Sequence, residues 1–166
     1  MRLIELAPAA LIGAVASARS MTPMAGIVVA HLMGKRTPGR LFLLNRPLFG
    51  WGALALGLGL GELLGDKMKS APDRTVALGL LSRVSSAGIA GAALAPRGRE
   101  KAGALTAIAA AVPLSYLTLA GRKRAIAEMG QTRSGLIEDA LIVTAAAVVV
   151  ALAVRPIDSK RKGFPA

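Results

Sequence analysis

The stretch LIEDALIVTAAAVVVALAV, residues 136–154, carries two acids near its start and no other charge. A helix needs about 20 mainly apolar residues to cross a bilayer, and this stretch approaches that length. Four more apolar segments precede it, at 3–33, 48–64, 76–95 and 102–120. The sequence therefore predicts an all-α fold, a polytopic transmembrane helical bundle of about five spans that forms a single domain over residues 1–154.

The composition favours a membrane protein over a water-soluble domain. Hydrophobic residues make up 54% of the 166-residue chain and aromatic residues only 3%, so the apolar content consists of long runs of small and aliphatic residues. Such runs indicate membrane spans. There is no cysteine and only one histidine, His31, which excludes thiolate chemistry and a zinc site built from several histidines. We therefore predict no metal, no cofactor and no enzymatic activity.

The net charge of +12 lies mostly between the apolar segments. Basic residues beside spans set orientation and contact anionic lipid headgroups, whereas nucleic-acid binding would call for stacking aromatic side chains. We expect the lipid bilayer and its anionic headgroups as partners, no nucleic acid, and a location in the bacterial inner membrane. The basic tail, 155–166, is expected to be disordered. With five spans, the first and third loops share a side with this tail, and the positive-inside rule favours a cytoplasmic C-terminus.

The first apolar segment is too long for one span, because 30 helical residues measure about 45 Å against a hydrocarbon core of about 30 Å. ARSMTP, residues 18–23, interrupts it with a charge, Arg19, and a proline, Pro23. Proline lacks an amide hydrogen and disfavours helix at the residue before it. We predict a broken or strongly kinked helix here, with Ser20 and Thr22 satisfying the backbone groups that the break frees.

A cleaved signal peptide is the alternative interpretation of the N-terminus. Arg2 could form its basic start, and Ala16-Ser17-Ala18 fits a small-x-small cleavage pattern. Against it, Glu5 and Pro8 interrupt the apolar stretch, and hydrophobicity resumes directly after the break.

Two arginines, Arg19 and Arg83, lie inside apolar segments. A charge within a span faces a protein interior, a water-filled cavity or a partner. We predict that these arginines pair with the acids of the chain or bind an anionic group such as a lipid phosphate. The alternative is that they extend to the membrane interface from near helix ends.

The most distinctive acids lie in GELLGDKMKS, residues 61–70, where Glu62 and Asp66 are followed by Lys67. Residues four apart share one helix face, with Cβ atoms about 6 Å apart, so these carboxylates could share a cation or a proton. The alternative is a helix that ends in the headgroup region beside its lysines. Acids at a helix C-terminus are unfavourable against the dipole, which favours the functional interpretation.

Glu138 and Asp139 allow two interpretations of equal weight. Ser134 could cap a helix whose first turn holds both acids, where they complement the positive end of the helix dipole. The other interpretation places both acids in the same functional cluster as Glu62 and Asp66.

A short internal repeat is predicted from ARSMTPMAG, 18–26, and SRVSSAGIAG, 82–91. Each has an arginine, then hydroxyl residues, then small residues, and an acidic pair follows each later in the chain. Two halves with the same order of features resemble the repeat construction of small transporters.

Glycines at every fourth position, Gly57, Gly61 and Gly65, form a ladder on the second segment. Small residues let helices approach closely in lipid. We expect this ladder to pack helices, either within the chain or between the chains of a homo-oligomer.

Four motifs follow one another along the chain: ARSMTP in the first apolar segment, GELLGDKM closing the second, LSRVSSAGIAGAAL in the third and SGLIEDALIV opening the last. In this order they resemble the small integral membrane proteins of the family DUF 4126, a domain of unknown function, over nearly the whole chain. The resemblance implies a polytopic membrane protein and no particular activity. A second likeness, to the Glu-x-Gly-Asp-Lys-Ser/Thr motif of cation/proton exchangers, is broken by one extra residue in 62–67 and by Met68, so it transfers no residue roles.

Three functional hypotheses follow. In the first, a small transporter moves a cation or a proton-coupled solute through an intramembrane cluster: Arg19, Ser20, Thr22, Glu62, Asp66, Lys67, Arg83, Glu138 and Asp139. In the second, a membrane scaffold or lipid-binding accessory protein uses the same charges as structural ion pairs. The third is a lipid-headgroup enzyme, which would need a metal held by carboxylates and for which the sequence offers no nucleophile.

Overall fold

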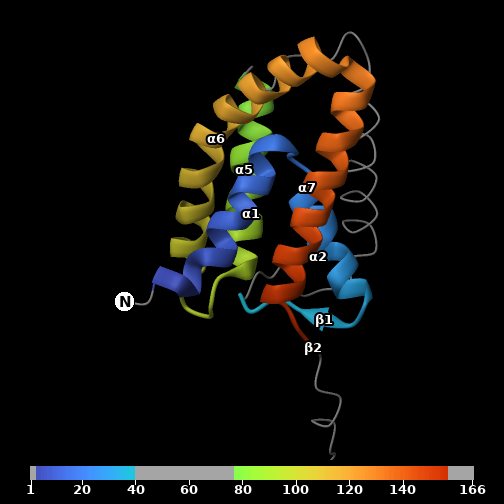
Figure 1. Ribbon diagram of the computed structural model, residues 1–166. Coiled ribbons are helices and arrows are strands. Elements are labelled where there is room, and N and C mark those ends of the chain that lie inside the picture. Colours follow the sequence, from blue (N-terminus) through green and yellow to red (C-terminus); the bar gives the residue numbers. More distant parts are fainter. Residues whose placement is uncertain (1–2, 40–76, 157–166) are drawn as a thin grey trace, which may run out of the picture.

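The computed structural model describes residues 3–39 and 77–156, which are 84% helical (Figure 1). The helices are η1 (Leu3–Leu6), α1 (Ala7–Ala18), α2 (Thr22–Leu32), α5 (Ala77–Leu94), α6 (Glu100–Met129) and α7 (Gln131–Ala153). Two short strands, β1 (Lys35–Arg36) and β2 (Arg155–Pro156), pair antiparallel. The predicted helical class is confirmed, with this small ladder as its exception. The predicted second segment, 48–64, lies outside the described residues.

Among the described residues, two helices are long and apolar enough to cross a bilayer, α6 and α7. Only 22% and 17% of their most apolar stretches are buried. A core helix of a soluble protein with this composition would be mostly buried, since apolar surface is driven out of water. The two helices are therefore compatible with a membrane location. The described residues do not establish five spans.

The first apolar segment folds as a hairpin of two short helices (Figure 1). The beginning of α1 lies beside the start of α6, because Arg99 donates to Glu5 at 2.9 Å. The end of α2 lies at the same end of the bundle as the start of α1. The strand that follows α2, β1, pairs there with β2, the strand that follows α7. The chain thus reverses at residues 19–21. The prediction that this segment is broken is confirmed.

Local sequence explains the reversal. Arg19 adopts an extended conformation, with φ −138° and ψ 114°, and ends α1. Pro23 lies in the first turn of α2, where its missing amide hydrogen costs no helical hydrogen bond. With 12 and 11 residues, α1 and α2 measure about 18 and 16 Å, well short of the roughly 30 Å of a hydrocarbon core.

Small residues bring α1, α5 and α6 together. A Cβ added at Gly13 of α1 would overlap the carbonyl oxygen of Ala107 on α6. Gly91 of α5 and Gly103 of α6 are equally close, since a Cβ on either would overlap the backbone of the other. Close approach through glycine and alanine replaces the bulky packing of a soluble core.

The helix α6 extends well beyond its predicted end. The basic residues 122–124, which the sequence assigns to a loop, lie within its last turns, and a single residue, Gly130 with φ 81°, separates it from α7. Pro113 lies inside α6, where a proline removes one helical hydrogen bond and favours a bend. Figure 1 shows α6 curving over the end of α1, so that its second half reaches the start of α7.

The bundle has two distinct ends. We call the end with β1, β2 and the loop 95–99 the strand end, and the end with the 19–21 reversal the turn end. At the strand end, the amide of Gly39 also donates to the carbonyl of Ala93 at 2.9 Å. Residues 35–39, the loop 95–99 and Arg155 therefore lie at one end of the bundle. Arg155 and Pro156, the first residues of the expected tail, form β2, and residues 157–166 lie outside the described part.

Candidate functional site

Buried and half-buried polar side chains from four helices and from the 19–21 turn gather at the turn end. We call this group the turn cluster: Ser17, Arg19, Arg83, Thr118, Arg122, Glu138 and Asp139. Four of its members were predicted as site residues, and the structure brings them together from positions up to 120 residues apart.

The first ion pair of the cluster joins the reversal to α7. Arg19 is fully buried and donates through Nη2 to the carboxylate Oδ1 of Asp139. The two side chains are 1% and 13% exposed. A buried charge is tolerated only when it is paired and hydrogen-bonded, so this contact accounts for an arginine inside an apolar segment. The pairing of Arg19 with an acid was predicted from the sequence.

The second arginine, Arg83, binds the end of α1. Its Nε donates to the carbonyl oxygen of Ser17 at 3.0 Å, and its Nη1 donates to the carbonyl of Gly79 at 2.9 Å. Thr118 Oγ1 lies 3.4 Å from the same Ser17 carbonyl. These donors satisfy a carbonyl that the end of α1 leaves open, and the positive charge complements the negative end of the helix dipole.

From the sequence we predicted that Ser20 and Thr22 would form hydrogen bonds to the backbone groups that the helix break frees. Both are buried in the turn. At the Ser17 carbonyl, however, the donors come from α5 and α6. No local pattern marks Thr118 as a partner, because it meets Ser17 across 101 residues of chain.

The second ion pair joins α6 and α7. Arg122 Nη1 lies 3.3 Å from Glu138 Oε2, and their side chains are 11% and 18% exposed. Sequence reasoning missed Arg122, because it assigned the basic residues after 120 to a loop. Its position four helical residues after Thr118 would have placed the two on one face, had α6 been predicted at its full length.

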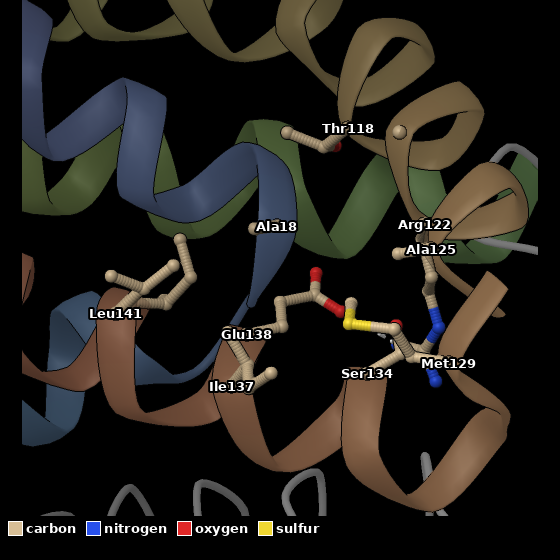
Figure 2. A pocket seen from close by; sticks show the side chains of 11 residues that line it. Ala18, Thr118, Arg122, Ala125, Met129, Ser134, Ile137, Glu138 and Leu141 are labelled. Atoms are coloured by element: carbon tan, nitrogen blue, oxygen red, sulfur yellow. Dashed lines mark hydrogen bonds and ion pairs between the residues drawn. The ribbon is translucent and has the colours of Figure 1, made fainter.

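A pocket of about 270 Å³ opens beside this pair. Figure 2 shows Arg122 and Glu138 reaching it from facing helices, with Ala18 at the end of α1 and Leu141 along α7. Its lining combines one ion pair and two hydroxyl residues, Thr118 and Ser134, with an otherwise apolar wall. The pocket therefore offers charge and apolar surface side by side.

The start of α7 contradicts the interpretation in which Ser134 caps the helix and Glu138 and Asp139 lie in its first turn. The cap is Gly130, and Ser134 lies inside the helix, so Ser134 is not the predicted N-cap. Glu138 and Asp139 lie about two turns into α7, about 10–12 Å from its start. They therefore complement arginines from other elements, and their place in the helix is not explained by the dipole.

The two segments of the predicted repeat have different backbone conformations, and Arg83 of the second contacts the chain next to the first. Residues 18–26 contain the reversal, whereas 82–91 lie within the continuous helix α5. Arg83 nevertheless binds the carbonyl of Ser17, two residues before Arg19.

Six predicted residues lie outside the described part of the chain: Glu62, Asp66, Lys67, Gly57, Gly61 and Gly65. Within residues 3–39 and 77–156, no three His, Cys, Asp or Glu side chains are grouped so as to hold a metal ion.

Comparisons with protein-family models, with curated proteins and with solved structures gave no match to this chain. The resemblance of its motifs to the DUF 4126 family stays a prediction.

Proposed function

We propose that this protein is an integral protein of the bacterial inner membrane that moves a cation or a proton-coupled solute through the turn cluster. The observation that carries the proposal is the reversal at 19–21, where two short helices meet and a fully buried arginine pairs with an acid of a candidate span. Broken helices with charged groups at the break are a recurring construction of transporter sites.

The depth of the cluster supports this proposal. The 23 residues of α7 measure about 34 Å, enough to cross the hydrocarbon core. Asp139 is the ninth of these residues, about 12 Å from the start of the helix. If α7 crosses the bilayer, the Arg19–Asp139 pair lies within the apolar layer, where ionisable residues are costly and mark ion or substrate paths.

In the proposed mechanism the two acids change partners. Asp139 faces Arg19 at the reversal, and Glu138 faces Arg122 at the pocket. A cation or proton that takes the place of an arginine at either carboxylate would weaken the contact between α7 and its neighbour. Because α1 and α2 are short and joined by only three residues, their reversal is the element that can move in response.

The proposal is tested by ion flux in proteoliposomes under imposed cation and proton gradients. We expect flux with the wild-type protein and its loss in Asp139→Asn and Glu138→Gln. The matched control is Glu5→Gln, which removes the exposed carboxylate at the strand end and should leave flux unchanged. Folding of each variant is checked by circular dichroism and by elution in detergent.

A second function is favoured by one observation: both acids of the described cluster are already bonded to arginines. A membrane scaffold or lipid-binding accessory protein would use such pairs only to hold its helices together. Absence of flux under every gradient, with Asp139→Asn merely less stable than the wild type, would support this function and contradict the transport proposal.

A further inference from the structure

We propose that Arg36 and Arg155, which face each other across the strand ladder, bind the phosphate of one anionic phospholipid between them. The site lies at the strand end of the bundle, away from the turn cluster. The inference rests on the membrane location in the proposed function and is independent of transport.

The ladder places two like charges side by side. In the register of β1 and β2, Arg36 lies directly opposite Arg155. Directly opposed residues of an antiparallel pair have Cα atoms about 4.5–5.5 Å apart, and their side chains leave the same face of the ladder. Like charges in this position destabilise the pairing of the two strands. An anion that neutralises both guanidinium groups would therefore stabilise the ladder.

Neither arginine has an acidic partner in the described part of the chain. Both side chains are exposed, and within residues 3–39 and 77–156 neither forms an ion pair. Arg99, at the same end, differs because it donates to Glu5. The ladder has little else to hold it together, since each strand has two residues and Pro156 lacks an amide hydrogen. The two opposed charges thus call for a counter-ion from outside these residues.

The pair lies at the depth of lipid phosphates if α7 crosses the bilayer. The run 140–154 carries no charge, and Arg155 follows it directly. The register of the ladder holds Arg36 at the same level. At this end the other candidate span, α6, begins at Glu100. A basic residue directly after a span lies at the membrane interface, among the headgroups and outside the hydrocarbon core.

The charge around the pair favours an anionic lipid over a zwitterionic one. Among the described residues of the strand end, only Glu5 and Glu100 are acidic, whereas six are basic: Lys35, Arg36, Arg97, Arg99, Lys101 and Arg155. A guanidinium binds phosphate through two parallel hydrogen bonds, so two opposed arginines can hold one phosphate from both sides. Phosphatidylglycerol supplies an unbalanced phosphate charge, whereas the choline of phosphatidylcholine balances its own phosphate.

The first test is native mass spectrometry of the full chain in a neutral detergent, titrated with phosphatidylglycerol or phosphatidylcholine. We expect one phosphatidylglycerol per chain in preference to phosphatidylcholine. Arg36→Gln and Arg155→Gln should each weaken its binding about tenfold, as the loss of one charged hydrogen bond implies. The matched control is Arg97→Gln, which removes an exposed arginine of the 95–99 loop at the same end and should leave binding unchanged.

A charge reversal separates the site from a general loss of stability. Arg36→Glu places opposite charges across the ladder, which stabilises strand pairing without a lipid. In lipid-free detergent this variant should unfold at a higher temperature than the wild type. Phosphatidylglycerol should raise the unfolding temperature of the wild type, because a ligand of the folded state stabilises it, and should leave that of Arg36→Glu unchanged.

The outcomes distinguish failure of this site from failure of the proposed function. Equal weakening by Arg97→Gln, or a lower unfolding temperature of Arg36→Glu in lipid-free detergent, would overturn the site and leave the membrane location intact. A rise of the same size with inorganic phosphate alone would overturn the lipid as its occupant. A chain that stays soluble and monodisperse without detergent would overturn both the site and the proposed function.

Discussion

The Arg19–Asp139 pair makes a quantitative prediction about stability. Two opposite charges about 4 Å apart attract by about 4 kcal/mol at an effective dielectric constant of 20. With side chains 1% and 13% exposed, water screens this attraction little. Removing one partner leaves a buried charge, so Arg19→Met or Asp139→Leu should each lower the free energy of unfolding by about 3–5 kcal/mol.

The double variant distinguishes a true pair from two independent losses. Arg19→Met combined with Asp139→Leu leaves no uncompensated charge, so it should cost less than the sum of the single changes. We expect a coupling energy of about 2–3 kcal/mol in the double-mutant cycle. The exposed pair of Glu5 and Arg99, with side chains 42% and 38% exposed, should give a coupling energy below about 1 kcal/mol.

Both cycles can be measured by reversible unfolding in mixed micelles of mild detergent and dodecyl sulfate, followed by far-ultraviolet circular dichroism. The control cycle uses Glu5→Gln and Arg99→Gln in the same micelles. A coupling energy near zero for the buried pair, or equal values for both pairs, would refute the conclusion that Arg19 and Asp139 hold the reversal to α7.

Two further predictions concern how the helices pack. Gly13→Ala should lower the free energy of unfolding by about 1–3 kcal/mol in the same micelles, because the added Cβ overlaps the Ala107 carbonyl. The control, Gly121→Ala, should be neutral or stabilising. Equal effects of the two changes would contradict the close approach of α1 and α6. Arg83→Met removes the Nε bond to Ser17 and should cost about 1.5–3 kcal/mol, with faster amide hydrogen exchange at the end of α1; unchanged exchange there would show that Arg83 does not hold that end.

Glu138 and Asp139 are neighbours on α7 but contact different parts of the protein. Neighbouring residues on a helix point about 100° apart, so Glu138 and Asp139 face different partners. Asp139 contacts the reversal and Glu138 the pocket. Changes at the two acids should therefore be separable: Asp139→Asn acts at the reversal, and Glu138→Gln acts at the pocket.

Much of this protein is determined by its sequence. Uninterrupted apolar runs specify helices, and the predicted segment 76–95 agrees closely with α5, Ala77–Leu94. A proline after a charged and polar stretch specifies where the first segment breaks, because both oppose a continuous helix. The rarity of charge in apolar surroundings likewise marks Arg19 as a residue that needs a partner, because the cost of burying a charge does not depend on the fold.

Tertiary structure alone decided the rest. A broken helix can bend or turn back, and contacts distant in sequence, Arg19 with Asp139 and β1 with β2, select the reversal. The end of α6 could not be read from hydrophobicity, because basic residues are good helix formers and α7 supplies a partner for Arg122. Which acid meets which arginine depends on how closely small residues let the helices approach, and that distance is a property of the assembled bundle.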